Sequence, residues 1–176
     1  TVSRLSELNL LDDDQIIEFA RGSLAAVSTF SPLLNADLVS LPNDPRATRI
    51  AIANPDVAPY GKAAKDLLMA HDNWVSVEKR VVYSGNVLQA LEFARTGNVD
   101  VAYVSRSVIV NNNHEGLWTI QSFGATETIG PVQVAAVINR SAKRDIARHF
   151  VDALQSEQAR AILVVYGYAP VTGEDY

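Results

Sequence analysis

The chain has 176 residues, of which 48% are hydrophobic and 20% are charged, and this composition excludes a disordered or fibrous protein. The formal net charge of −5 argues against a nucleic-acid partner, because phosphate backbones need a concentrated basic face and the lysines and arginines are scattered. The absence of cysteine excludes disulfides, thiolate metal sites and a cysteine nucleophile.

The first part of the chain predicts a helix end, a turn and one buried strand. The run Asp12–Asp14 indicates a capped, solvated turn, and Gln15–Phe19 is a short amphipathic stretch. Leu24–Thr29 is apolar and bounded by turn residues, which predicts a strand. Ser40–Arg46 carries two prolines and predicts a crossover loop at a boundary between two lobes.

From residue 50 onward the pattern alternates between strands and helices. Strands are predicted at Ile50–Ala53, Val81–Tyr83 and Val99–Val104, with helices at Gly61–Ala70 and Val87–Thr96. Such alternation predicts βαβ units and a largely parallel sheet. Ligands of these sheets collect at the carboxyl ends of the strands, so the loops after each strand are the candidate functional segments.

The last part of the chain predicts one strand and two helices. Val132–Asn139 is a further strand, and Ser141 is placed to cap a helix that runs through Leu154. Ser156 begins the last helix, and Gly167 supplies the left-handed residue that ends it.

The loop after the first βαβ strand has the geometry of an anion site. The strand breaks at Asn54, and Pro59 and Tyr60 lead into a helix whose first backbone N–H groups would point at the loop. An ordinary strand-to-helix connection with nothing bound explains these residues equally well.

The loop after the second strand predicts a second group of amides. Asn86 is expected to cap the helix, so that the amides of Val87 and Leu88 point toward the strand end. Capping alone is a sufficient role for Asn86, and the bound-anion interpretation depends on the two loops facing each other.

The third loop follows a buried strand and carries Ser105, Arg106 and Ser107. A hydroxyl at a strand end can donate to an oxyanion, and a guanidinium can add charge-assisted bonds. For Arg106 a solvated surface charge is the preferred explanation, and Ser105 is the better candidate of the two.

Four stretches, in this order along the chain, resemble the periplasmic molybdate-binding proteins of ABC transporters. Asn54–Gly61 reads Asn-Pro-Asp-Val-Ala-Pro-Tyr-Gly, and Gly85–Val87 precedes a helix rich in Ala and Leu. Gly97–Val104 reads Gly-Asn-Val-Asp-Val-Ala-Tyr-Val, and Ser156–Tyr168 ends in Leu-Val-Val-Tyr-Gly-Tyr. The resemblance implies an α/β fold of the type II periplasmic-binding-protein class, with two lobes of mixed, mostly parallel sheet flanked by helices.

In that family a tetrahedral oxyanion lies between the lobes and is held by neutral hydroxyl and amide donors. The resemblance implies that Tyr60, after Pro59, and the amide of Val87, beside Asn86, contact the metal oxyanion. Ser105 matches a position that is a tyrosine in some relatives. The implied ligand is molybdate or tungstate, with no other cofactor.

The family's opening strand, its Ala-Ala-Ser-Leu-like turn and its Gly-Ser-Ser-Gly-like loop have no counterpart in this sequence. The first lobe is therefore expected to be incomplete: residues 1–46 form its remnant and the crossover, 47–139 the second lobe, and 140–176 the helices that return to the first lobe. An incomplete lobe leaves a sheet edge and an apolar surface open, which predicts self-association.

The expected function is that of an extracytoplasmic receptor that delivers an oxyanion to an inner-membrane ABC permease. The alternative is the ligand-sensing effector domain of a transcriptional regulator with the same fold. An enzyme is not expected, because a nucleophile elbow, a Walker-type phosphate loop and paired carboxylates at strand ends are missing from the sequence.

Overall fold

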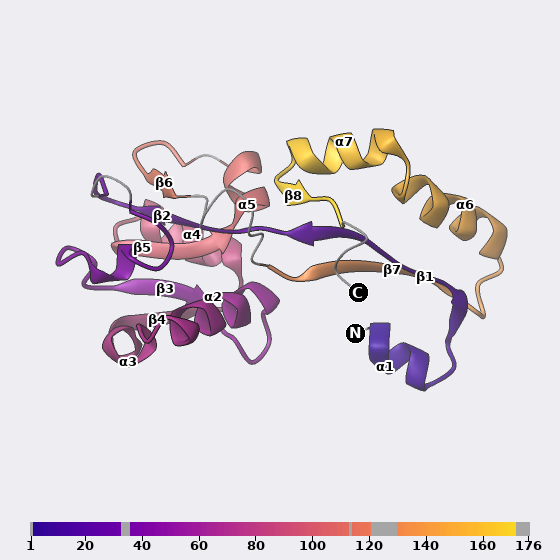
Figure 1. Cartoon of the computed structure of the whole chain (residues 1–176), viewed down its shortest axis with the longest axis horizontal. Helices are drawn as coiled ribbons and strands as arrows, with labels where there is room; N and C mark the ends of the chain where they lie inside the picture. The colour runs from indigo at the N-terminus through magenta and orange to yellow at the C-terminus, as the bar shows by residue number, and fades with distance from the viewer. Residues whose placement is uncertain (1, 33–35, 113, 121–129, 172–176) are drawn as a thin grey trace. The chain divides into compact units, whose positions relative to one another are not determined.

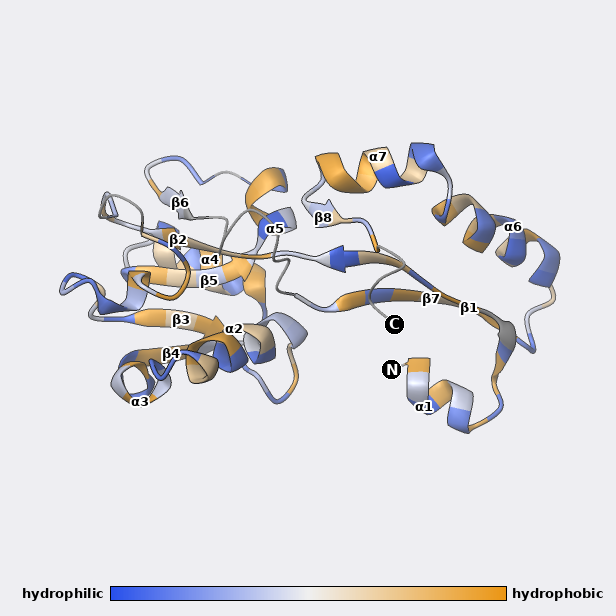
Figure 2. Cartoon of the chain, in the orientation of Figure 1, coloured by the Kyte–Doolittle hydropathy of each residue, from blue (hydrophilic) through white to orange (hydrophobic). Residues whose placement is uncertain are grey.

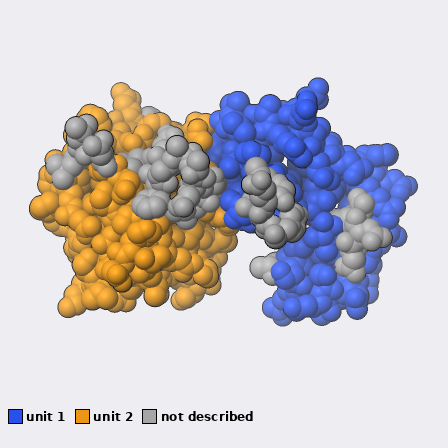
Figure 3. Space-filling model, in the orientation of Figure 1, with its two compact units in different colours: residues 1–21, 132–176 blue, residues 22–131 orange. Residues whose placement is uncertain are grey.

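The computed structural model describes every residue except 1, 33–35, 113, 121–129 and 172–176, and leaves the side chains of residues 13–15 and 120 undescribed. The chain divides into two compact units (Figures 1 and 3). Unit 1 comprises residues 1–21 and 132–176, and unit 2 comprises residues 22–131.

Unit 2 is built on a five-stranded sheet with the strand order β4-β3-β5-β2-β6. The strands are β2 (Leu24–Ser28), β3 (Ile50–Ala53), β4 (Val81–Ser84), β5 (Val101–Ser105) and β6 (Trp118–Ile120). Strand β3 pairs in parallel with β4 and β5, whereas β2 pairs antiparallel with β5 and β6. The predicted alternation of strands and helices is thus confirmed for the central part of this sheet.

In the part of unit 2 that the structure describes, four α-helices and two short 3-10 helices accompany the sheet (Figure 1). They are η1 (Leu41–Asn43), α2 (Pro59–Ala70), α3 (Trp74–Val77), η2 (Glu78–Arg80), α4 (Val87–Arg95) and α5 (Arg106–Asn111). Helix α2 begins two residues before its predicted start. The reason is that Pro59 occupies the first helical position, where its missing N–H costs nothing and its fixed φ suits the helix.

The central strands of the sheet of unit 2, β3, β5 and β2, are buried on both faces. One face, with Ile50, Ile52 and Tyr103, packs against α2 and α3, and the other, with Ala51 and Val104, packs against α4. Because successive residues of a strand point to opposite faces, each central strand is a continuous apolar run that supplies two cores. Unit 2 is therefore a three-layer α/β structure.

Polar groups fix the connection that precedes β3. Asp100 Oδ2 accepts hydrogen bonds from the Thr48 amide (2.9 Å), the Thr48 hydroxyl (2.7 Å) and the Arg49 amide (2.8 Å). The Tyr103 hydroxyl donates to the carbonyl of Leu38. Burial, and then the charge of Asp37, raises the pKa of Tyr103, so this side chain stays a neutral donor.

Unit 1 contains a three-stranded sheet with the order β7-β1-β8 and three helices. Its elements are α1 (Val2–Glu7), β1 (Leu11–Gly22), β7 (Val132–Ile138), α6 (Arg144–Leu154), α7 (Glu157–Val165) and β8 (Tyr168–Ala169). Strands β1 and β7 pair antiparallel, with register shifts between Leu11 and Ile16 and between Glu18 and Ala20.

An ion-pair cluster joins α6 to the start of β1. Asp12 Oδ2 lies 3.0 Å from Arg144 Nη2 and 2.5 Å from Arg148 Nη2, and the Asp12 side chain is only 10% exposed. Hydrogen bonds from Arg148, and then from Arg144, lower the pKa of Asp12.

The prediction for residues 12–19 is wrong, because they belong to β1 and form neither a turn nor a separate amphipathic stretch. Pairing with β7, more than a hundred residues later, overrides the turn propensity of consecutive aspartates. The two units also divide the chain at positions other than those predicted. Strand β2 belongs to the sheet of unit 2 because it pairs with β5, and β7 belongs to unit 1 because it pairs with β1.

The C-terminal helices are close to their predicted positions. Helix α6 begins at Arg144 with Lys143 as N-cap, so Ser141 is not its cap, although Ser141 Oγ accepts a hydrogen bond from the Lys143 amide at 3.1 Å. Helix α7 begins next to Ser156 as predicted, and the Ser156 hydroxyl caps it by accepting from the amide of Ala159 at 3.2 Å. Gly167 has a φ of 87°, as expected for a left-handed helix end.

The difference in burial between two neighbouring residues of α2 predicts that their substitutions lower the stability of unit 2 by different amounts. Leu68 is fully buried, whereas Met69 is 52% exposed. We expect Leu68→Ala to lower the free energy of unfolding of unit 2 by about 2–5 kcal/mol, because it leaves a cavity. Met69→Ala should change it by less than about 0.5 kcal/mol. Urea unfolding followed by tryptophan fluorescence reports on unit 2, because both tryptophans belong to it. Equal effects of the two substitutions would contradict the packing of Leu68 in the core.

The ion-pair cluster of unit 1 predicts a pH dependence. Because the folded-state pKa of Asp12 lies below the ordinary value of 3.8, the pair stabilises unit 1 above that pH and is lost as the pH falls through the folded pKa. NMR titration of the carboxyl group should show this lowered pKa. Arg148→Gln should move the pKa back toward 3.8, and Arg160→Gln on α7 should leave it in place. A pKa of Asp12 that does not respond to Arg148→Gln would contradict the cluster.

Candidate functional site

Three helices of unit 2 begin where three adjacent parallel strands end. Strand β3 leads through a loop into α2, β4 leads through Gly85 and Asn86 into α4, and β5 leads directly into α5. The order β4-β3-β5 places these three ends side by side at one edge of the sheet. All five predicted site residues, Pro59, Tyr60, Asn86, Val87 and Ser105, belong to these connections.

The loop after β3 is held in shape by Asn54. Its Oδ1 accepts from the Asp56 amide at 3.0 Å, and its carbonyl accepts from the amides of Val57 (3.2 Å) and Ala58 (2.8 Å). The Asn54 amide in turn donates to the carbonyl of Ser84 at 2.8 Å, which ties the end of β3 to the end of β4. The loop geometry is therefore set by the backbone and the side chain of Asn54.

The first turn of α2 lies directly over the end of β3. A Cβ atom on Gly61 would come within 1.9 Å of the carbonyl oxygen of Ala53, so only glycine permits this approach. The N-cap residue, Ala58, makes no side-chain cap. The amides at the start of α2 thus lie at the strand end, and no side chain of the N-cap residue accepts a hydrogen bond from them.

Tyr60 lies in this first turn and is half-buried. A Cβ atom on Gly22 would lie 2.0 Å from the Tyr60 hydroxyl oxygen, so the ring tip contacts the backbone at the first residue of unit 2. A similar close approach occurs at Gly130, where a Cβ would lie 2.1 Å from the carbonyl oxygen of Gly22. The Gly22 amide also donates to the carbonyl of Pro131 at 2.9 Å.

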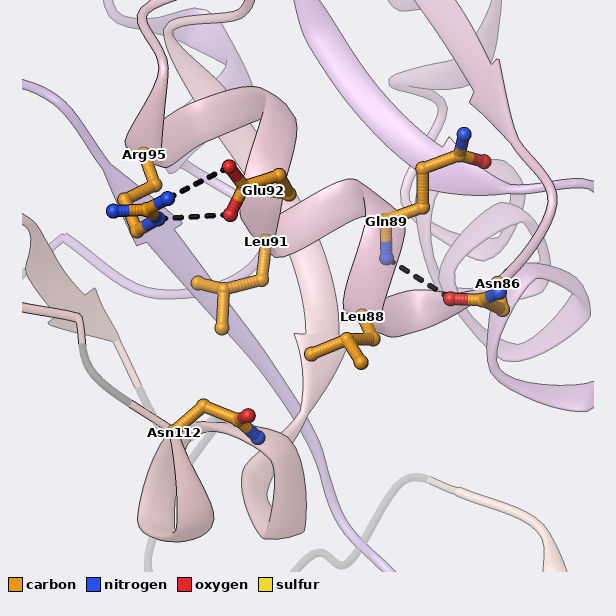
Figure 4. Close-up of a pocket in the computed structure, with 7 residues that line it drawn as sticks. All are labelled: Asn86, Leu88, Gln89, Leu91, Glu92, Arg95 and Asn112. Atoms are coloured by element: carbon orange, nitrogen blue, oxygen red, sulfur yellow. Dashed lines mark hydrogen bonds and ion pairs between the residues drawn. The ribbon is translucent and has the colours of Figure 1, made fainter.

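The second loop confirms Asn86 as the N-cap of α4. Asn86 Oδ1 accepts from the amide of Gln89 at 2.9 Å (Figure 4). Gln89 Oε1 in turn accepts from the amide of Gly85 at 2.6 Å. Ser84 Oγ lies 2.9 Å from the carbonyl of Asn86 and braces the turn. The amide of Val87 occupies the first helical position, before any intrahelical acceptor. Whether Val87 binds a ligand stays a prediction.

Ser105 has a structural role in the third loop. It is 1% exposed, and its hydroxyl accepts from the amide of Val108 at 3.2 Å and lies 2.9 Å from Ser107 Oγ. It therefore caps α5, in addition to any role in binding. Arg106 is half-buried, and its amide donates to the carbonyl of Ser23 at 2.8 Å.

The three helix starts together form a concentration of positive backbone dipoles. None of the predicted site residues carries a charge, and Lys62, the first cation of α2, is paired with Asp66 at 2.5 Å. Aligned N–H dipoles at helix N-termini favour an anion without a cationic side chain. Among the described residues, no group of three or more His, Asp or Glu side chains could hold a metal ion.

A separate pocket runs along the exposed side of α4 and has a volume of about 580 Å³ (Figure 4). Its lining residues are Asn86, Leu88, Gln89, Leu91, Glu92, Arg95 and Asn112. Glu92 and Arg95 form two hydrogen bonds of 2.8 Å at its rim. Of these residues only Asn86 was a predicted site residue. The helical spacing of the lining residues between 88 and 95 could have indicated that they share one side of α4. No pattern in the sequence indicates that Asn112 lies beside them.

The fold and the three helix starts define a solute-binding lobe of the α/β class. The family of bacterial extracellular solute-binding proteins matches residues 1–169. The chain belongs to this family.

Individual relatives are more distant. The molybdate-binding protein ModA of Rhodobacter capsulatus is 30% identical over 120 residues, which are 68% of this chain and 46% of ModA. YvgL of Bacillus subtilis (strain 168), described as an ABC transporter substrate-binding lipoprotein, is 27% identical over 168 residues, which are 95% of this chain and 59% of that protein. The chain thus spans about half the length of these relatives.

A solved structure extends the likeness to 97% of this chain. The periplasmic molybdate-binding protein of Azotobacter vinelandii superimposes with a TM-score of 0.79 at 22% identity, over 97% of this chain and 74% of that one. This agreement confirms the predicted type II periplasmic-binding-protein fold.

The close contact between α2 and β3 predicts that an alanine at Gly61 destabilises unit 2 much more than an alanine at Gly85 does. Gly61→Ala would force Cβ against the Ala53 carbonyl, and we expect it to lower the free energy of unfolding of unit 2 by about 1–3 kcal/mol. Gly85→Ala meets only the end of the Gln89 side chain, at 3.3 Å, and should cost less than about 0.5 kcal/mol. Urea unfolding measures both; a neutral Gly61→Ala would show that α2 does not rest on the strand end.

Proposed function

We propose that this protein is an extracytoplasmic receptor for molybdate, tungstate or a similar tetrahedral oxyanion, and that it delivers this solute to an ABC permease of the inner membrane. The anion is its only bound partner of low molecular mass, and no cofactor takes part. The protein binds its solute and performs no covalent chemistry.

One observation carries this proposal: the starts of α2, α4 and α5 meet at the ends of three adjacent parallel strands. Helix N-termini supply N–H donors and a partial positive charge, which together suit a compact dianion. The name of ModA from Rhodobacter capsulatus supports molybdate as the anion.

Neutral donors also fit the charge of the chain. With a net charge of −5 the protein has no general field that attracts anions, so local dipoles have to replace the hydration shell of the ligand. Within this proposal Tyr60 and the Val87 amide contact the anion, while Asn86, Pro59 and Ser105 hold the surrounding turns. Because the donors are dipoles, binding should depend only weakly on ionic strength.

The receptor is proposed to act outside the cytoplasm, in the periplasm or at the outer surface of the membrane. The family is named for extracellular solute binding, and YvgL is described as an ABC transporter lipoprotein. None of the helices in the described part of the chain is long and apolar enough to cross a bilayer. The alternative, an effector domain of a transcriptional regulator, finds no support in the family match.

Calorimetric titration of the 176-residue chain with molybdate, tungstate, sulfate and phosphate tests the proposal. We expect saturable binding of molybdate or tungstate, with an affinity that changes little between low and high sodium chloride. Absence of binding for all four anions would contradict the oxyanion function.

The same titration with two variants tests the role of the Val87 amide. Val87→Pro removes this donor but suits the first helical position, and the extended conformation of Asn86 is the one preferred before proline. Val87→Ala keeps the amide and is the matched control. A lost hydrogen bond to a charged ligand costs about 1.5–3 kcal/mol, so Val87→Pro should bind roughly 10- to 100-fold more weakly than Val87→Ala. Equal affinities would exclude Val87 as a ligand.

A further inference from the structure

Gly22 and Gly130 are required by their surroundings and not by their backbone conformation. Neither residue has a positive φ, so neither adopts the left-handed conformation that favours glycine. A side chain at either position would collide with a neighbour. A Cβ atom on Gly22 would lie 2.0 Å from the Tyr60 hydroxyl oxygen, and one on Gly130 would lie 2.1 Å from the carbonyl oxygen of Gly22.

The two collisions differ in the atoms that would have to move. At Gly22 the three nearest atoms all belong to the tip of the Tyr60 ring: the hydroxyl oxygen, Cζ at 2.8 Å and Cε1 at 3.3 Å. At Gly130 they are backbone atoms of Gly22 and Ser23. Overpacking is relieved more easily by a side-chain end than by backbone. A methyl group at Gly22 would therefore displace the Tyr60 ring, whereas one at Gly130 would displace the chain.

The backbone of Gly22 and Ser23 is itself fixed by hydrogen bonds. The Gly22 amide donates to the carbonyl of Pro131 at 2.9 Å, and the Ser23 carbonyl accepts from the amide of Arg106 at 2.8 Å. The next residue begins β2, which pairs along its whole length with β5. In the contact between Gly22 and Tyr60, the glycine is thus the fixed partner and the ring the movable one.

The first turn of α2 is consequently held at two points. Gly61 lies against the carbonyl of Ala53, and the Tyr60 ring reaches from the same turn to Gly22 and packs against the buried core. Figure 2 shows that β3, which ends at this turn, is apolar along its length. Because Pro59 has no N–H, the amides of Tyr60 and Gly61 are the first donors of α2. Both points of contact therefore belong to the residues that carry these donors.

We infer that Gly22 is a positioning residue of the anion site. Its missing side chain lets the Tyr60 ring reach the backbone at Gly22, and this contact holds the first amides of α2 at the strand end. Donors that are fixed before the ligand arrives bind it more tightly, because no reorganisation opposes binding. The inference rests on the oxyanion binding proposed above and adds a residue that lies outside the three helix starts.

A double-mutant cycle tests whether Gly22 acts through Tyr60. Calorimetric titration with molybdate compares the unsubstituted chain, Gly22→Ala, Tyr60→Phe and the double variant. We expect Gly22→Ala alone to weaken binding by about tenfold, because ligand donors have to lie within about 0.5 Å of their place. Tyr60→Phe removes the oxygen that Cβ would meet at 2.0 Å and leaves Cζ at 2.8 Å, so in this background Gly22→Ala should weaken binding by at most about threefold. Equal losses in the two backgrounds would overturn the inference.

NMR spectra of the unliganded chain test the positioning without an anion. Gly22→Ala should shift the amide signals of Tyr60 and Gly61, and Tyr60→Phe should reduce these shifts. Met69→Ala, at the other end of α2 and 52% exposed, is the control that should leave both signals in place. Amide signals of Tyr60 and Gly61 that do not respond to Gly22→Ala would overturn the inference. This arm decides whether Gly22 positions the start of α2 even if the chain binds none of the four anions and the proposed function fails.

Urea unfolding followed by tryptophan fluorescence separates positioning from general destabilisation of unit 2. Gly22→Ala should leave the unfolding midpoint close to that of the unsubstituted chain, because the Tyr60 ring can move away. Gly130→Ala should lower the midpoint clearly, since its Cβ meets the carbonyl of Gly22. If Gly22→Ala lowers the midpoint as much as Gly130→Ala does, the backbone yields in place of the ring, and the inference is wrong.

Discussion

The parallel pairing of β4, β3 and β5 is the constraint on which the rest of unit 2 depends. Parallel strands need crossover helices, and a sheet buried on both faces forces those helices to cover each face in turn. All three strands then end at the same edge, and each following helix starts there. The concentration of N–H dipoles at that edge is thus a consequence of sheet topology, and individual side chains only adjust it.

Unit 1 depends on a different kind of interaction. Its long strand β1 is held by pairing with β7 and by Asp12, which binds both Arg144 and Arg148. A largely buried carboxylate between two arginines fixes the position of α6, but such pairs contribute modest net stability because desolvation opposes their attraction. The two units therefore differ in what holds them together: unit 2 relies on apolar burial, whereas unit 1 relies on backbone pairing and a polar cluster.

Features that depend on neighbouring residues in the sequence are predicted well, whereas features that depend on distant residues are missed. Ile50–Ala53 is predicted at its observed bounds, and Asn86 is predicted as a cap, because turn residues and caps act within a few positions. The strand at Asp12–Phe19 is missed because its partner β7 lies beyond residue 131. Asn112 joins the α4 pocket through packing between helices, which leaves no local signal. Similarly, the sequence places Ser105 at a strand end but does not reveal that its hydroxyl is hydrogen-bonded to the hydroxyl of Ser107.

The three helix starts are not equivalent, because their caps differ. Asn86 and Ser105 each use a side-chain oxygen to satisfy one amide of the following helix, which leaves fewer donors for a ligand. Helix α2 has Ala58 at the same position, so no N-cap side chain satisfies an amide there, and the backbone carbonyl of Asn54 shapes its loop. Pro59 at the first helical position supplies no N–H, so the first amides of α2 are those of Tyr60 and Gly61. Its first turn lies close to the end of β3 because residue 61 is glycine. The loop from Asn54 to Tyr60 therefore differs from the other two in that its helix start carries no side-chain acceptor at the N-cap.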